Sequence, residues 1–290
     1  MNEGNSMKQQ LPDPRTIQPQ IMLELDFYTE GPVAAHDGSI YYTDLAGKGI
    51  YHYQNGKSVL WAKGNRPNGQ ALLANGDHLV CDSSFARVIR YDREGKFLGE
   101  VSPKQISGDN ITCPNDIAIH STTGFYFTDS VRHNGGVYFV GWDGKSYTVA
   151  DGIDFPNGIV YIEEEGLLYI AESYKNRLLK VDLNLPSNSS DYLTVMATLP
   201  FNNQNKETGN LPDGLAVDQD GRLWVAHYGM QAIQVLSRGG RLLASYDSGI
   251  PLTSNLCFAG GDLWMTGGLG EPGPGKLSRI NIGIQGRYLI

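Results

Sequence analysis

The chain has 290 residues, of which 40% are hydrophobic and 36 are glycine, a composition that suits one large turn-rich domain. Its formal net charge of -8 at pH 7 provides no basic face, so we expect no nucleic-acid partner. No apolar run approaches the ~18 residues of a transmembrane helix, so we also expect no membrane association.

The N-terminal segment is polar. Residues 1–20 lack the basic start and the apolar stretch of a signal peptide, so they are predicted to form a flexible tail before a single domain at 21–290. The cysteines (Cys81, Cys113 and Cys257) are odd in number and lack zinc-ligand spacing, which favours reduced thiols and a cytoplasmic protein. No long apolar heptad pattern is present, so a monomer is expected.

From residue 21 onward, short apolar or alternating strands are separated by turns. Ile21–Phe27 has strand character, and later strands are predicted at Gly158–Ile162, Leu167–Ala171, Arg177–Asp182, Gly214–Val217 and Arg222–Ala226. Because no segment shows a sustained 3.6-residue apolar period, the chain is predicted to be all-β.

An oxygen-bearing residue recurs at the start of six repeated segments. The segments are Glu30-Gly31-Pro32, Pro67-Asn68-Gly69, Pro114-Asn115-Asp116, Pro156-Asn157-Gly158, Pro212-Asp213-Gly214 and Ser254-Asn255-Leu256. The recurring residues lie 38, 47, 42, 56 and 42 positions apart, and a strand-rich repeat of about 40 residues is typical of a β-propeller blade. A six-bladed β-propeller is therefore predicted, with a two-sheet sandwich as the all-β alternative. Each proline is expected in the loop just before a strand, because it cannot donate into a central ladder.

In a propeller the first strand of each blade lines the central channel. The six recurring residues should then converge on one axis, where their oxygens would form a central-channel site for a hard cation. An isolated Asn or Asp between Pro and Gly is usually a turn residue, but recurrence at one blade position favours the metal site. Ile21–Phe27 is predicted to pair with the last blade and close the ring, which leaves fewer open sheet edges.

Loops between the second and third strands of each blade should return to the end of the channel where this site lies. These loops are predicted to contain His133, Tyr174, His227 and Tyr228, which become candidate substrate contacts. Arg66, just before the second repeated segment, is the candidate cation at the channel mouth. The alternatives are a solvated or hydrogen-bonded loop histidine and a surface ion pair for Arg66.

Four of the repeated segments, those that contain Glu30, Asn115, Asn157 and Asp213, resemble the gluconolactonase/regucalcin (senescence marker protein) superfamily, as does Tyr126-Phe127-Thr128-Asp129. The chain is similar, more distantly, to drug-responsive lactonase and diisopropylfluorophosphatase. The resemblance implies one divalent cation, usually Ca²⁺ with Zn²⁺, Mn²⁺ or Mg²⁺ as alternatives. Matched motif by motif, its ligands would be Glu30, Asn115, Asn157 and Asp213, with Asn68 and Asn255 close to the ion or the substrate.

The chemistry implied by the resemblance is hydrolysis of a small-molecule lactone or ester. The metal would polarise the carbonyl, and Asp213 would act as general base, with direct nucleophilic attack by Asp213 as the competing assignment. Sugar lactonases of the regucalcin type carry an arginine where this chain has Cys113, which favours a less polar lactone. A phosphotriesterase of the diisopropylfluorophosphatase kind and a non-catalytic calcium-binding propeller are the alternative functions.

Overall fold

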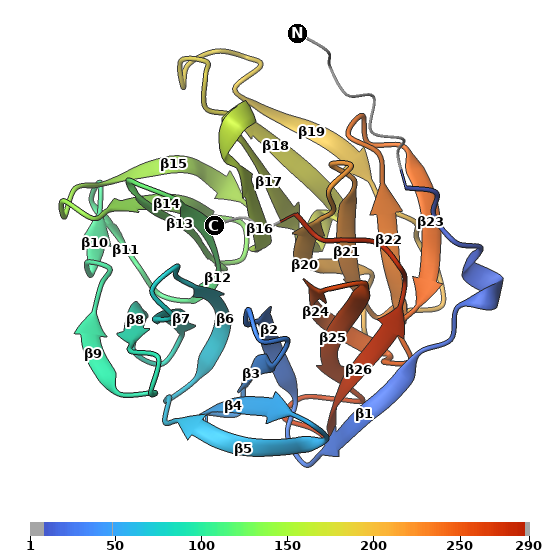
Figure 1. Ribbon diagram of the computed structural model, residues 1–290. Coiled ribbons are helices and arrows are strands. Elements are labelled where there is room, and N and C mark those ends of the chain that lie inside the picture. Colours follow the sequence, from blue (N-terminus) through green and yellow to red (C-terminus); the bar gives the residue numbers. More distant parts are fainter. Residues whose placement is uncertain (1–8, 48, 288–290) are drawn as a thin grey trace, which may run out of the picture.

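Six four-stranded antiparallel sheets surround a central axis in the computed structural model, which describes residues 9–47 and 49–287 (Figure 1). The six-bladed β-propeller is therefore confirmed. In blades 1 to 5 the strands follow chain order from the axis outward, because each antiparallel neighbour is reached by a short turn, and in blade 6 the outermost strand comes from the start of the domain.

The first three blades contain the following strands. Blade 1 has β2 (Thr29–Ala34), β3 (Ile40–Asp44), β4 (Gly49–Gln54) and β5 (Lys57–Ala62), and blade 2 has β6 (Pro67–Leu72), β7 (His78–Asp82), β8 (Arg87–Tyr91) and β9 (Phe97–Glu100). Blade 3 has β12 (Pro114–His120), β13 (Gly124–Asp129), β14 (Gly135–Gly141) and β15 (Ser146–Ile153), and is preceded by a small hairpin of β10 (Gln105–Ile106) and β11 (Asp109–Asn110).

The other three blades complete the ring. Blade 4 has β16 (Pro156–Ile162), β17 (Leu167–Glu172), β18 (Arg177–Asp182) and β19 (Leu193–Thr198), and blade 5 has β20 (Leu211–Val217), β21 (Leu223–Tyr228), β22 (Ala232–Leu236) and β23 (Leu242–Asp247). Blade 6 has β24 (Leu252–Ala259), β25 (Asp262–Gly268) and β26 (Gly275–Asn281). The described helices are short 3₁₀ turns: η1 (Pro14–Thr16), η2 (Glu163–Glu165) and η3 (Ser173–Lys175).

The ring is closed by the first strand of the chain. Strand β1 (Gln20–Leu25) pairs antiparallel with β26, with Gln20 opposite Arg279 and Leu25 opposite Gly275 (Figure 1). This confirms that the strand expected at Ile21–Phe27 joins the last blade. The pairing gives blade 6 its fourth strand and ties the two ends of the domain together.

Apolar side chains fill the spaces between neighbouring blades. Between blades 3 and 4, the Tyr126 and Tyr161 rings pack 5.0 Å apart, and within blade 5 the Trp224 and Tyr246 rings stack at 5.6 Å. Each sheet is covered by another on both faces, so its strands read as apolar runs rather than strict alternation.

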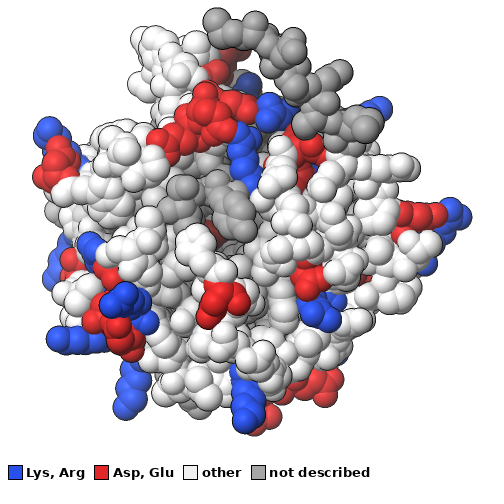
Figure 2. Space-filling model, viewed as in Figure 1, with Lys and Arg blue, Asp and Glu red and all other residues white. Residues whose placement is uncertain are grey.

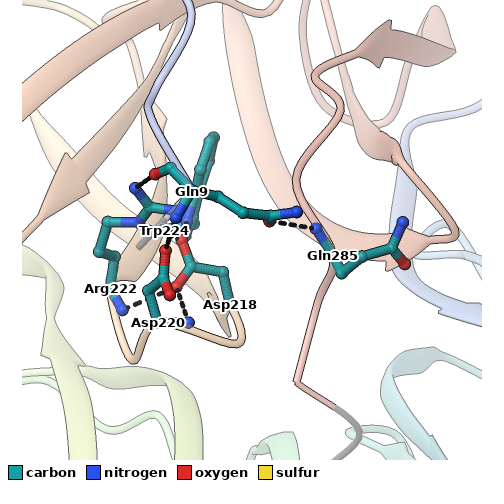
Figure 3. A network of polar contacts seen from close by, with 6 residues as sticks. All are labelled: Gln9, Asp218, Asp220, Arg222, Trp224 and Gln285. Atoms are coloured by element: carbon teal, nitrogen blue, oxygen red, sulfur yellow. Dashed lines mark hydrogen bonds and ion pairs between the residues drawn. The ribbon is translucent and has the colours of Figure 1, made fainter. Parts of the chain in front are cut away.

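Residues 9–17 are held against blades 5 and 6, whereas residues 1–8 of the expected tail lie outside the described residues. Arg222 donates to the Gln9 carbonyl at 2.7 Å, and the Gln9 backbone N–H donates to Asp220 at 2.8 Å (Figure 3). Leu11 and Ile17 pack on the apolar cluster between these blades. The packed chain thus begins before the domain start predicted at residue 21.

Figure 2 shows charged side chains in small clusters of both signs, separated by wide uncharged areas. Within the described ranges, the helices are too short and too polar to cross a membrane.

Candidate metal centre

The six recurring residues lie on the innermost strands of the six blades. These strands contact one another around the axis in the closed sequence β2, β6, β12, β16, β20, β24. All six residues are only 5–8% exposed, although they are polar: Glu30, Asn68, Asn115, Asn157, Asp213 and Asn255. Side chains from six segments distant in sequence therefore share one buried environment at the axis.

A break in strand register accompanies the recurring residue in every blade. In blade 2 the pairing shifts between Pro67 and Gln70, and in blade 4 between Pro156 and Ile159, with equivalent shifts in the other four. A β-bulge redirects side chains out of the normal alternation, so it can turn the recurring residue toward the axis.

The prolines begin or lie inside the inner strands rather than ending the loops before them. Pro67, Pro114 and Pro156 are the first residues of β6, β12 and β16, and Pro212 is the second of β20. The expected position was therefore wrong by a residue or two. An inner strand pairs within its sheet on one side only, so a residue without an N–H is tolerated there.

The glycine that follows the recurring residue allows neighbouring inner strands to approach closely. A Cβ at Gly158 would collide with the Asp213 carbonyl, and one at Gly214 would collide with the Asn255 amide. Only glycine leaves room for these contacts, which bring the recurring residues of adjacent blades together.

Two buried carboxylates form the electrostatic centre of the site. Burial raises the pKa of Asp213 well above its ordinary value, and the nearby charge of Glu30 raises it further. Burial likewise raises the pKa of Glu30, with further increases from the charges of Asp116 and Glu271. Asn157 donates to Asp213 and Asn255 donates to Glu30, which partly offsets these increases. The raised pKa values mean that the ionised forms of these two buried acids are unfavourable without a positive charge nearby, so the site favours binding of a cation.

The donor set fits a hard divalent cation. Among residues 9–47 and 49–287, no three His, Cys, Asp or Glu side chains gather as a metal-binding group, so a metal here would require amide oxygens as well as the two carboxylates. The Oδ1 atom of Asn68 is buried and accepts no hydrogen bond within the described part of the chain. Carboxylate and amide oxygens are the ligands that Ca²⁺ prefers.

Acidic residues at the ends of the second strands hold the loops around the site and were not predicted from the sequence. Asp82 accepts from the backbone N–H groups of Asn65 and Arg66 at 2.9 and 3.1 Å, and Glu172 accepts from that of Asp154 at 2.9 Å. Asp129 accepts from the backbone of Cys113. Their recurrence at one blade position is a signal that could have been found.

Arg66 and Cys113 precede the inner strands of neighbouring blades, and the charge of Arg66 acts on the Cys113 thiol. Burial raises the pKa of the half-buried Cys113 thiol, and Asp129 raises it further, while the Arg66 guanidinium acts in the opposite direction. Arg66 is exposed and forms no ion pair within the described ranges.

His133 lies between β13 and β14 and Tyr174 lies in η3, at the end of blades 3 and 4 where the inner strands begin. The Arg132 guanidinium stacks on the Tyr174 ring at 3.5 Å and donates to Asp154 at 2.9 Å. The His133 side chain is 77% exposed, with its Nδ1 atom 3.4 Å from Asp154. This cluster presents one cation and one aromatic ring beside the channel entrance.

His227 lies in strand β21, opposite Pro212, and not in the loop expected from the sequence. It is fully buried, its Nε2 atom is 3.0 Å from the Asn176 side chain, and burial lowers its pKa to about 4. A neutral histidine in this position joins blades 4 and 5.

Tyr228 donates from its hydroxyl group to Glu271 at 3.2 Å. Glu271 belongs to the loop between β25 and β26 and was not among the site residues predicted from the sequence. Its charge acts on Glu30, Asp213 and Tyr28, so it lies above the same site.

A cavity of about 510 Å³ occupies the channel beyond the ring of recurring residues. It is bordered by Asp116 and Asn255 at the site and by Gln285 and Arg287 near the opposite end. Asp116 is buried, and its pKa is raised by burial to about 7. The chain after β26 crosses toward the end of the channel opposite the recurring residues, where Gln285 and Arg287 border the cavity (Figure 1).

The fold and the oxygen-bearing side chains at its axis define the class of protein, a six-bladed β-propeller with a candidate metal centre. The model of the SMP-30/Gluconolactonase/LRE-like region matches residues 28–267. The chain belongs to this family.

Among its relatives, the lactonase drp35 of Staphylococcus aureus is 31% identical over 213 residues. The match covers 62% of this chain and 63% of the relative, which is less than two thirds of the relative's own length.

Solved structures share the fold. The gluconolactonase XC5397 from Xanthomonas campestris superposes with a TM-score of 0.77 at 21% identity, covering 93% of this chain and 91% of that one. The calcium-binding protein regucalcin from Agrobacterium tumefaciens gives 0.72 at 17% identity, covering 94% and 96%.

Proposed function

We propose that this protein hydrolyses a small-molecule lactone with the help of one divalent cation, most simply Ca²⁺. The observation that carries the proposal is the buried pair of Glu30 and Asp213, hydrogen-bonded to Asn255 and Asn157, in a member of this family. The names lactonase drp35, gluconolactonase and calcium-binding regucalcin support the proposed reaction and metal.

Glu30, Asn115, Asn157 and Asp213 would hold the cation, with Asn68 and Asn255 beside it. When bound, the cation supplies a Lewis acid that polarises the substrate carbonyl. Glu30 has the longer side chain and its carboxylate also accepts from the Gly31 N–H at 3.0 Å, which suits a fixed ligand. Asp213 accepts the proton of the attacking water and passes it to the leaving alkoxide oxygen.

The substrate is proposed to be a less polar lactone than a free sugar lactone. Cys113 offers a small, soft surface, while Arg66, Tyr174 and Tyr228 supply one cation and two aromatic rings around the mouth. His133 adds an exposed ring on the same rim. A cytoplasmic location and a monomeric state remain predictions.

The decisive experiment measures lactone and phosphotriester hydrolysis by purified protein, each with Ca²⁺ and with a chelator. Chelator-sensitive hydrolysis of lactones that exceeds phosphotriester turnover is the expected result. Greater phosphotriester turnover would assign the alternative enzyme. Calcium binding without turnover of either ester class would assign a non-catalytic propeller.

A further inference from the structure

Glu271 is an acidic residue at the mouth of the metal centre that neither the metal nor the proposed base requires. It lies in the loop between β25 and β26 and accepts a hydrogen bond from the Tyr228 hydroxyl, with 3.2 Å between the oxygens. It is exposed, and no lysine or arginine in the described parts of the chain forms an ion pair with it. Its negative charge therefore acts on whatever enters the mouth.

The position of Glu271 is fixed from two sides. The carbonyl of the adjacent Pro272 accepts from the Tyr28 backbone N–H at 2.8 Å, two residues before Glu30. Gly273 and Gly275 lie so close to the backbone at Asp26 and Phe27 that a Cβ at either position would collide with it. The loop is thus packed against the segment that leads into Glu30, while Tyr228 holds the carboxylate from blade 5.

The negative charge of Glu271 changes the charge balance of the proposed metal centre. Glu30 and Asp213 would together balance the charge of one divalent cation. Asp116 and Glu271 also act on these two carboxylates, and of the two Glu271 is the one exposed at the mouth, so its negative charge adds to that of the site. Glu271 would repel a negatively charged group on a substrate at the mouth and attract a positively charged one, because charge–charge interactions are stronger where water is partly excluded.

We propose that Glu271, held by Tyr228, selects neutral or cationic lactones over anionic ones at the mouth of the channel. This inference rests on the proposed lactonase function and adds a charge preference to it. The same residue disfavours rebinding of the product, because opening a lactone ring creates a carboxylate.

The test compares wild-type protein with Glu271→Gln, Tyr228→Phe and Glu207→Gln. Glu207 is a matched control, since it is also exposed and lies in the loop that leads into β20. The substrates are γ-butyrolactone, its α-amino derivative and its γ-carboxylate, which share one ring and differ in charge. Calcium affinity is measured by calorimetry on the same proteins, without substrate.

Glu271→Gln should raise kcat/KM for the carboxylate relative to the neutral lactone by about tenfold, the size expected for one like charge at partly screened range. It should also weaken Ca²⁺ binding severalfold, because a nearby negative charge is lost. Tyr228→Phe should shift both quantities in the same direction by less. Glu207→Gln should change neither.

An unchanged charge preference together with unchanged Ca²⁺ affinity in Glu271→Gln would overturn the proposal, as would an equal change in Glu207→Gln. If wild-type protein opened none of the three lactones, the proposed function would fail separately. The calcium measurement would still decide whether Glu271 acts on the metal centre, because it needs no turnover.

Discussion

Glu30 and Asp213 lie on strands β2 and β20, in the first and fifth blades, yet each is buried within electrostatic range of the other. Their proximity raises the pKa of Asp213 beyond the effect of burial alone. Two neighbouring buried acids cost free energy when both are ionised, and a divalent cation between them would remove that cost. This relationship supports the proposed metal-dependent chemistry and leads to the first two predictions.

Asp213→Asn should lower lactone hydrolysis by at least about a hundredfold, the usual contribution of a general base. The amide keeps the shape and one oxygen for the metal, so Ca²⁺ should still bind, though less tightly. Turnover and calorimetry on the same preparation test this, with Asn68→Ala as a control that should cost much less. A near-normal rate with calcium bound would mean that the base lies elsewhere.

Calcium should stabilise the folded protein, because only the closed ring brings the ligands together. At about 100 times Kd the gain is about 2.7 kcal/mol, which corresponds to a Tm increase of several degrees. Glu30→Gln should lose most of this increase without lowering the metal-free Tm, since it removes one of two neighbouring buried acids.

The matched control is Glu24→Gln on β1, where the side chain is 77% exposed. Calorimetry should find one ion per chain. Absence of Ca²⁺, Mn²⁺ and Zn²⁺ binding to chelator-treated protein would contradict the metal centre.

His78 should make folding stability depend on pH. Burial lowers its pKa to about 4 from an ordinary value of 6.5, so between these values the unfolded chain binds more protons than the folded one. Stability should therefore fall as pH decreases from 6.5 toward 4, by about 3 kcal/mol for this residue.

The His78 contribution is measured as the difference in unfolding free energy between wild-type protein and His78→Gln across this pH range. Glutamine can still hydrogen-bond to Gln70, whose Oε1 atom lies 2.9 Å from His78 Nδ1. If the two proteins lost stability in parallel, the histidine would not be buried in its neutral form.

Removal of residues 1–27 should abolish soluble folded protein, because it deletes β1 and opens blade 6. Removal of residues 1–18 should cause a smaller loss of Tm, through the contacts of Gln9 and Leu11 with blades 5 and 6. Thermal unfolding of both truncations, beside one that lacks only residues 1–8, tests the order of these effects. An unchanged Tm after the longest truncation would show that β1 does not close the ring.

The repeat of Pro-Asn-Gly-like segments was enough to predict the blades and the oxygen-bearing residues of their inner strands, because each blade repeats the same short local structure and a period is visible along the chain. The closing strand was predicted from the strand character of Ile21–Phe27 and from the open edge that it would cover. The strand predicted at Arg177–Asp182 matches β18 residue for residue, whereas the strands predicted from Gly158 and Gly214 begin earlier, at Pro156 and Leu211. The register shifts next to Asn68 and Asn157 were not predicted, because a bulge depends on pairing with the next strand.

What only the tertiary structure decided is which loop residues face the centre. Glu271 of blade 6 accepts a hydrogen bond from Tyr228 of blade 5 and its charge acts on Glu30 of blade 1, while the charge of Arg66 acts on Cys113 of the next blade. His227 is consistent with a loop position in the sequence, yet it is buried in β21. Loop residues such as Glu271 and Arg66 do not recur from blade to blade, and their neighbours are set by closure of the whole ring, so the identity of these contacts is not encoded in any local stretch of the chain.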